Sequence, residues 1–312
     1  DSIRHALKNF KEYQPTGLVL VPLFVTTMYK KIQSEAQRSG KGKILSVGTK
    51  VAHKLSLAGI DLSNKLFRDV REAFGGRLHK IICGGAALNP DLIEAFEAFG
   101  ISIYEGYGIT ECSPLVAVTP YWKRKPGTVG PAVPCCEIRI EGTETNDLGF
   151  LSGEVQVKGD NVMLGYMNND EANEDAFTDD GWFRTGDVGY LDKDGYLTIT
   201  GRMKSVIVLD NGKNVFPEEI EEYLENIDTI AESVIVGRTE EDTGETKLVA
   251  VIFPAYEKYP DLSENDLRGE IQKSIAALNK KLPSFKQIHK LEFRKTEFEK
   301  TSSRKIKRHL VK

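Results

Sequence analysis

Apolar residues near the start of the chain follow two different spacings. The run from Leu18 to Val21 is continuous and predicts a strand, and the sequence around residues 26–37 predicts a helix. Between residues 63 and 74, apolar side chains recur every three or four positions. This spacing predicts another helix, which Gly75-Gly76 ends.

The following segments continue the alternation around a glycine-rich turn. Residues 78–83 predict a buried strand that runs directly into Gly84. Asn89 followed by Pro90 predicts a helix start, because asparagine caps backbone N–H groups and proline fits the first helical position. Residues 101–104 predict another strand. Strand, turn, helix and strand in this order predict a parallel α/β sheet.

A change of pattern follows at about residue 130. Short alternating segments, such as 154–158 and 196–200, are separated by turns rich in glycine and aspartate. This pattern is typical of a small β-subdomain. We therefore expect an α/β region at about 1–129 and a β-subdomain at about 130–200.

The last third of the chain predicts a separate small α+β domain at 201–312. Residues 217–226 form an acidic-started helix pattern, and 233–236 and 247–253 resemble strands. Ser263 with Asp266 resembles a capping box, and it opens a helix whose i, i+4 stripe of apolar residues runs from Leu267 to Leu282. The fold class that we expect is α/β: part of a large N-terminal α/β domain with a small β-subdomain, then a small mobile α+β C-terminal domain.

Composition narrows the function classes. The 312 residues are 40% hydrophobic and 28% charged with a net charge of −4, which is ordinary for a globular protein and gives no general attraction to nucleic acid.

The four cysteines form no Cys-x-x-Cys pair, so neither a zinc site nor a disulfide framework is expected, and the cytoplasm is the expected compartment. The longest apolar run, 18–25, is interrupted by Pro22 and is too short to span a bilayer. Peripheral membrane contact and the oligomeric state stay open.

Four segments carry groups that suit a nucleotide. A glycine-rich turn after a strand lets the backbone approach a flat ligand, although it also serves as a tight connection. In chain order the segments are Gly84–Leu88, Tyr104–Glu111, Gly181–Asp187 with Gly201–Ser205, and Lys300–Arg308.

Individual side chains in these segments have matching chemistry. Tyr107 can stack on adenine, Thr110 can bond a phosphate oxygen, and Glu111 can hold Mg²⁺ beside the phosphates. Asp187 can accept from both ribose hydroxyls with its two carboxylate oxygens, and Arg202 can bond ribose or phosphate. Each also has a structural reading, as a core tyrosine, a turn cap or a surface ion pair.

Together the segments resemble the acyl-adenylate-forming superfamily, which includes acyl-CoA synthetases, luciferases and the adenylation domains of peptide synthetases. The likeness covers nearly the whole chain. It is densest at 153–221, where GEVQVKG, NVMLGY, GWFRTGD, GRMK and PEEIE occur in family order. Residues 20–22 with 28–32, and 211–214 before Pro217, are similar to AMP-forming acyl-CoA synthetases of the long-chain fatty acid type.

The resemblance implies a role for each residue in the first half of the site. Thr110 would contact the α-phosphate of ATP, and Glu111 would help to hold Mg²⁺. The adenine would be lined by Gly84, Gly85, Ala86 and Tyr107.

The resemblance implies further roles in the second half. Asp187 would bind the ribose hydroxyls, assisted by Arg202, and Lys204 would be the hinge of the small domain. Gly212 would lie near the pantetheine tunnel of coenzyme A. Lys305 would stabilise the transition state of adenylation.

The implied reaction has two steps. A fatty acid carboxylate attacks the α-phosphate of ATP and displaces pyrophosphate, and the thiol of coenzyme A then attacks the acyl carbon and releases AMP. The first step depends on charge stabilisation and in-line positioning, so no nucleophile–base pair is needed. The partners expected are therefore small molecules: fatty acid, ATP and coenzyme A, with Mg²⁺.

Two departures from the family shape the expectation for this chain. Arg304 stands where most relatives carry a glycine before the lysine, and Lys307 is the local alternative to Lys305. No segment upstream of Gly84 resembles the Ser/Thr/Gly-rich phosphate loop of the family. We therefore expect a C-terminal fragment, inactive alone, that at most binds AMP or a partner. Adenylation of another carboxylic acid is the alternative for the parent enzyme. Tyr107, Glu111 and Asp187 are expected to converge on one nucleotide cleft.

Overall fold

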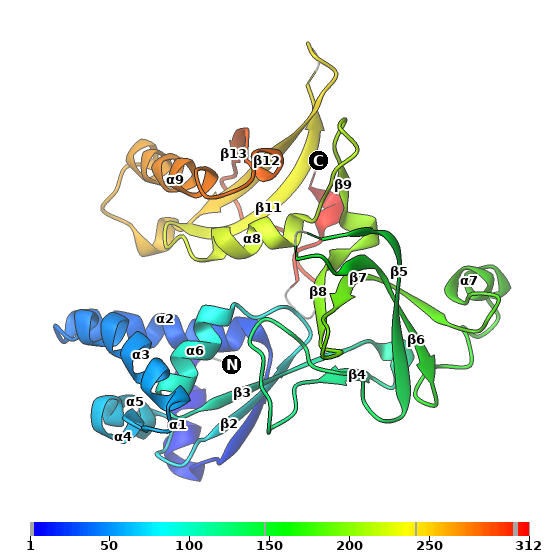
Figure 1. Ribbon diagram of the computed structural model, residues 1–312. Coiled ribbons are helices and arrows are strands. Elements are labelled where there is room, and N and C mark those ends of the chain that lie inside the picture. The colour runs from blue at the N-terminus through cyan, green and yellow to red at the C-terminus, as the bar shows by residue number, and fades with distance from the viewer. Residues whose placement is uncertain (1–2, 147, 241, 302–304, 312) are drawn as a thin grey trace. The chain divides into compact units, whose positions relative to one another are not determined.

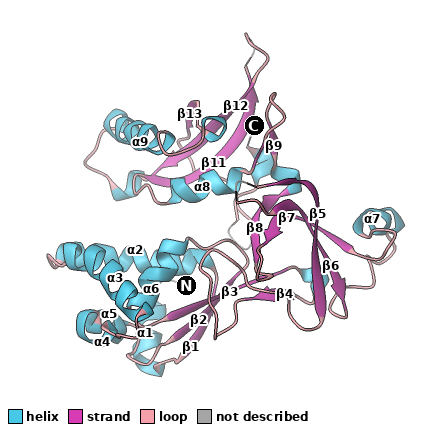
Figure 2. Cartoon of the chain, in the orientation of Figure 1, coloured by secondary structure: helices cyan, strands magenta, loops and turns pink. Residues whose placement is uncertain are grey.

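The computed structural model describes residues 3–146, 148–240, 242–301 and 305–311 (Figure 1). The predicted mixed α/β fold is confirmed: helices and several sheets alternate along the chain (Figure 2). The chain forms two compact units. The first unit comprises Asp1–Thr185 and Gly189–Ile199, and the second comprises Gly186–Val188 and Thr200–Lys312. Every helix in the described ranges is too short or too polar to cross a membrane.

The first unit contains a four-stranded sheet with helices. Its strands have the order β1-β2-β3-β4, with β1, β2 and β3 parallel and β4 antiparallel to β3. The strands are β1 (Gly17–Leu20), β2 (Lys80–Gly84), β3 (Ser102–Gly108) and β4 (Leu115–Val118). The helices are α1 (Ile3–Tyr13), α2 (Pro22–Arg38), α3 (Gly42–Leu57), α4 (Ser63–Leu66), α5 (Arg68–Ala73) and α6 (Pro90–Ala98).

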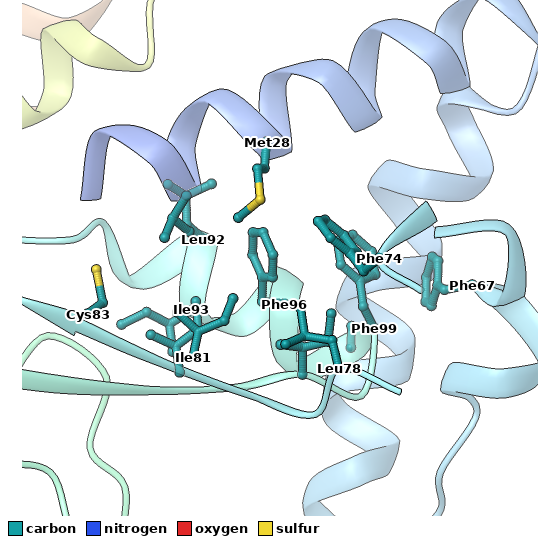
Figure 3. Packing of buried hydrophobic residues seen from close by; sticks show 14 of the residues in the cluster. Met28, Phe67, Phe74, Leu78, Ile81, Cys83, Leu92, Ile93, Phe96 and Phe99 are labelled. Carbon is teal, nitrogen blue, oxygen red and sulfur yellow. The ribbon is translucent and has the colours of Figure 1, made fainter. Parts of the chain in front are cut away.

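Helix α6 contributes Leu92, Ile93 and Phe96 to the hydrophobic core of this unit (Figure 3). Asn89 caps it, because its side-chain oxygen accepts from the backbone N–H of Asp91 at 2.8 Å, and Pro90 occupies the first helical turn. Phe96 and Phe99 are fully buried with ring centroids 5.7 Å apart. Their burial packs the carboxyl-terminal end of α6 into this core.

The helix predicted at 63–74 is divided into α4 and α5. The break lies at Phe67, which has φ −123° and ψ 27°. The Phe67 side chain is buried, and its ring lies 5.0 Å from that of Phe99. We attribute the break to this contact, since burial of an aromatic ring offsets the loss of one helical turn.

A second sheet in the chain has the order β5-β6-β7-β8. Its members are β5 (Cys136–Thr145), β6 (Leu151–Gly159), β7 (Phe183–Leu191) and β8 (Leu197–Arg202), and α7 (Asp170–Ala176) lies between β6 and β7 in sequence. Val155, Val157 and Leu197 are fully buried, in a cluster with Cys112 and Val116. This cluster joins the β-subdomain to the segment that follows β3.

The second unit is built on a three-stranded sheet of order β11-β12-β13. β11 pairs antiparallel with β12, and β13 pairs parallel with β12. Ile220 of α8 and Ile271 of α9 are fully buried in the main core of this unit. The elements are β9 (Ile207–Val208), β10 (Asn214–Val215), α8 (Pro217–Glu225), β11 (Ile230–Thr239), β12 (Thr246–Pro254), α9 (Glu264–Asn279) and β13 (Lys290–Phe293).

Candidate functional site

The turn Gly84–Ala86 lies at the carboxyl end of β2. Gly84 is paired with Gly106 of the parallel strand β3, and a Cβ added to Gly84 would lie 2.9 Å from the Gly106 carbonyl oxygen. Gly85 has φ +92°, a backbone conformation that favours glycine, and Gly85 and Ala86 are exposed. The sequence therefore needs small residues here, and the resulting turn leaves backbone open to a ligand.

The carboxyl end of β3 lies beside this turn. Tyr107 is opposite Ala117 of β4 and is half-buried against the cluster around Cys112. Gly108 must be small, because an added Cβ would lie 2.0 Å from the carbonyl oxygen of Pro114. The structure thus brings the Gly84–Ala86 turn and Tyr107 to the same edge of the sheet, where parallel α/β sheets bind ligands.

Thr110 and Glu111 lie on a one-turn 3₁₀ helix, Thr110–Cys112, directly after β3. The chain reverses after this turn at Ser113, which has φ +57°, and the backbone N–H of Ile109 donates to the carbonyl of Pro114 at 2.9 Å. Thr110 is exposed and Glu111 is half-buried. Both side chains therefore lie just beyond the carboxyl end of a parallel strand.

Glu111 is held by a segment that the sequence analysis matched only as a family motif. The Tyr166 hydroxyl donates to Glu111 Oε1 at 3.0 Å, and the Met163 N–H donates to the Glu111 carbonyl at 2.7 Å. Partial burial, together with Glu111, raises the pKa of Tyr166. The sequence alone did not place Tyr166 beside Glu111. The only signal was its position at the end of the NVMLGY motif.

Glu111 is suited to take part in a magnesium site. Mg²⁺ is usually held by one or two carboxylates together with substrate phosphates, so a single protein carboxylate is sufficient. Among the described residues, no group of three or more His, Cys, Asp or Glu side chains could hold a metal ion alone. The Tyr166 hydrogen bond engages one carboxylate oxygen and orients the group.

Two cysteines next to these segments do not supply a nucleophile. Burial raises the pKa of Cys112 to about 12. Burial, with a smaller effect from the charge of Glu105, raises the pKa of Cys83 to about 12. Both thiols therefore stay neutral near pH 7, and a thiolate is the form that attacks.

In the second unit, Asp187 and Arg202 form an ion pair. Asp187 lies on β7 and is only 4% exposed, and Arg202 lies at the end of the neighbouring strand β8. Arg202 Nε is 2.9 Å from Asp187 Oδ1, while the Arg202 side chain is 64% exposed. The structure thus brings these two predicted residues together. The convergence of Asp187 with Tyr107 and Glu111 of the first unit stays a prediction.

Lys204 and Gly212 lie on two exposed turns of the second unit. Lys204 belongs to the 3₁₀ turn Met203–Ser205, which directly follows β8. Gly212 has φ +75° in the loop between β9 and β10, where the Leu209 N–H donates to the Lys213 carbonyl at 3.0 Å. The positive φ explains the glycine without reference to a ligand.

Lys305 lies near the end of the chain, beside an antiparallel bridge that joins two described segments, residues 297–301 and 305–308, which we call the hairpin. Lys300 and Ile306 form an antiparallel bridge, and the Thr301 N–H donates to the Lys305 carbonyl at 2.8 Å. Lys305 is exposed, and Lys307 Nζ lies 4.0 Å from Glu299. Arg304, the residue that departs from the family pattern, lies outside the described residues.

Comparison with known proteins matches most of the chain to one enzyme family. Residues 1–167 match the AMP-binding enzyme family, and residues 204–312 match the AMP-binding enzyme C-terminal domain. A long-chain-fatty-acid–CoA ligase from Mycobacterium bovis, FadD15, is 33% identical over 340 aligned residues, which cover 99% of this chain and 55% of that protein. An indoleacetate–CoA ligase from Aromatoleum aromaticum is 41% identical over 56% of this chain and 34% of its own length.

A solved structure agrees with the sequence relatives. ATP-bound MatB from Rhodopseudomonas palustris is 26% identical with a TM-score of 0.69, over 99% of this chain and 52% of MatB. The chain therefore spans about half the length of the proteins it matches. With both family models matched in order, the chain belongs to the AMP-binding enzymes and is related to long-chain-fatty-acid–CoA ligases.

Proposed function

We propose that the full-length protein is an AMP-forming ligase that activates a long-chain fatty acid and transfers it to coenzyme A. The observation that carries this proposal is the likeness to a long-chain-fatty-acid–CoA ligase over 99% of the chain. It is supported by a turn and two side-chain positions that lie together at the carboxyl ends of adjacent parallel strands, namely Gly84–Ala86, Tyr107 and Glu111.

Within the first unit, the ends of the two neighbouring strands bind different parts of ATP. The exposed turn Gly84–Ala86 and the ring of Tyr107 bind the adenine, since small residues allow close approach and an aromatic face stacks on the base. Thr110 donates its hydroxyl to the α-phosphate. Glu111 holds Mg²⁺, which when bound neutralises phosphate charge.

Within the second unit, Asp187 accepts hydrogen bonds from the ribose hydroxyls. Its partner Arg202 orients the carboxylate, because Arg202 Nε lies 2.9 Å from Asp187 Oδ1. Lys204 follows the last strand of the β-subdomain, so that torsions at this exposed turn reorient the small domain between the two steps. Gly212 belongs to the loop that approaches the pantetheine chain.

Lys305 carries the charge stabilisation of the first step. As carboxylate oxygen attacks the α-phosphorus, negative charge develops on the phosphoryl oxygens, and an ammonium group placed there lowers the barrier. The second step forms a thioester and breaks the bond between acyl carbon and AMP, which needs space for the thiol. The lysine is therefore required in adenylation and dispensable in thioester formation.

Two measurements on the full-length protein test this proposal. AMP release is followed with ATP, coenzyme A and a panel of acids that includes a long-chain fatty acid, indoleacetate and 2-succinylbenzoate. The fatty acid should give the highest kcat/KM. Lys305→Ala should lower the adenylation rate on the order of 10²–10³-fold, as loss of one preorganised charge-stabilising group does, with Lys307→Ala as the matched control. Equal rates for the two variants would contradict the role of Lys305.

A second candidate is a ligase for an aryl or other acid. The indoleacetate–CoA ligase relative favours it, because its identity of 41% is higher than that of the long-chain relative, although it extends over only 56% of the chain. Preference for indoleacetate in the acid panel would establish this alternative. We also propose that the 312 residues alone form no acyl-adenylate, which a single-turnover assay on this chain tests directly.

A further inference from the structure

The hairpin that carries Lys305 is attached to β11 at both legs. On the first leg, the backbone N–H of Phe298 donates to Glu232 Oε2 at 2.9 Å, and Lys300 forms an ion pair with the same carboxylate. Phe298 is buried with Val234 and Val251 on one face of the sheet. The first leg is therefore held by a charged side chain of β11 and by a small apolar cluster.

Arg308 attaches the second leg. Its Nη2 lies 2.6 Å from Glu221 Oε2, and its Nη1 donates to the Ile235 carbonyl at 2.9 Å. The other oxygen of Glu221 accepts from the Ile235 N–H at 2.6 Å. Arg308 and Glu221 thus engage both backbone groups of one β11 residue. Glu218 Oε1 lies 3.6 Å from the same arginine nitrogen.

This network joins two consecutive elements to a segment that lies 73 and 87 residues further along the chain. Glu221 comes from α8, Ile235 from β11, and Arg308 from the segment only three residues after Lys305. Between them, Ile306 packs against the apolar cluster of Phe298. An arginine can hold a carboxylate and a carbonyl at once because its donors are fixed in one plane. The position of the Lys305 backbone is consequently determined by two anchors rather than by a free tail.

We infer that Arg308 is a positioning residue for adenylation, which through Glu221 and Ile235 holds the hairpin so that Lys305 is presented in one geometry. This inference rests on the proposed function. Arg308 does not itself contact a substrate. Its loss leaves Lys305 present but displaced, and a displacement of about 1 Å lowers a rate by up to about 10²-fold.

The test separates the two half-reactions in the full-length protein. Arg308→Gln should lower the rate of acyl-adenylate formation by at least about tenfold. Thioester formation from supplied acyl-adenylate and coenzyme A should stay within about twofold of wild type, because that step does not use Lys305. In a Lys305→Ala background, Arg308→Gln should add less than about twofold, since the residue it positions is already gone.

Arg238→Gln is the matched control. Arg238 pairs with Glu292 at 3.2 Å in the same unit and is similarly exposed, at 31% against 27% for Arg308, but this ion pair joins β11 to β13 and not to the hairpin. It should leave both half-reactions unchanged. If Arg308→Gln fails to fold in thermal melting, Glu232→Ala tests the first leg, with the same split expected.

Each outcome bears on one claim. If Lys305→Ala lowers adenylation but Arg308→Gln behaves like Arg238→Gln, the positioning role is wrong and the proposed function stands. Equal loss of both half-reactions in Arg308→Gln also overturns the positioning role, because it indicates general structural damage. If Lys305→Ala itself leaves adenylation unchanged, the assignment of Lys305 under the proposed function is wrong, and the inference falls with it.

Discussion

Replacing Asp187 with asparagine removes a negative charge from the proposed ribose site while keeping the shape of the side chain. The carboxylate is 4% exposed and faces Arg202 Nε at 2.9 Å. Because the Arg202 side chain is 64% exposed, solvent screens the ion pair. The free energy of unfolding should therefore fall by only about 1 kcal/mol, as for other solvent-screened pairs.

The effect on AMP binding should be larger than the effect on stability. Hydrogen bonds to a charged group contribute about 1.5–3 kcal/mol each. Asparagine keeps one acceptor oxygen, which is now uncharged, and replaces the other with an NH2 donor, so one of the two ribose hydroxyls loses its acceptor. The loss of one such bond corresponds to roughly a 10-fold to 150-fold weaker Kd for AMP.

Titration calorimetry with AMP on the full-length protein measures this change. Asp180→Asn is the matched control, since Asp180 also pairs with an arginine, Arg139, at 2.6 Å, but lies outside the proposed site. Thermal melting of both variants separates lost affinity from lost structure. An Asp187→Asn protein that melts normally and binds AMP within twofold of wild type would refute the ribose assignment.

Three further predictions follow from other features of the chain. Tyr166→Phe removes the 3.0 Å hydrogen bond to Glu111. It should raise the Mg²⁺ concentration needed for half-maximal adenylation about tenfold, since hydrogen-bond partners of metal ligands typically contribute that much to metal affinity. An unchanged Mg²⁺ titration would contradict this role of Tyr166. Lys204→Pro should impair thioester formation more than adenylation in half-reaction assays, because it restricts the proposed hinge, and equal loss would count against the hinge. Cys112 has a pKa of about 12, so at pH 8 only about 10⁻⁴ of it is thiolate, and exposed Cys135 should react with a disulfide reagent first. The reactivity of Cys112 should rise only as pH approaches its pKa or on unfolding, and rapid reaction of Cys112 itself in the folded protein at pH 8 would contradict its burial.

Local signals in the sequence predicted those elements whose own residues determine them. Asn89 and Pro90 predicted the start of α6, since capping and a fixed φ are properties of those two residues. Helix α3 was not predicted. Its sequence contains Gly42 and Gly48, which weaken helices, and it is stabilised by burial of Leu45 and Ala52 in the core. Packing of this kind is not visible in a local pattern.

The candidate site shows the same difference between local motifs, which the sequence predicts, and contacts made by folding, which it does not. Tyr107, Glu111 and Asp187 stand in motifs that could be matched along the chain. The hydrogen bond from Tyr166 to Glu111 joins residues 55 positions apart, and the pair of Arg308 with Glu221 joins residues 87 positions apart. Such contacts depend on which loops the fold brings together, so residue type and spacing alone do not predict them.

The pairing of Gly84 with Gly106 has a practical consequence for altering the proposed adenine site by directed evolution. The two positions face each other in adjacent strands but tolerate change unequally. A methyl group at 84 would meet a main-chain oxygen at 2.9 Å, whereas at 106 its nearest neighbour is the flexible tip of Leu115 at 3.4 Å. Variant libraries should therefore randomise position 106 together with 115 and keep 84 fixed, because most diversity placed at 84 would be lost to misfolded clones.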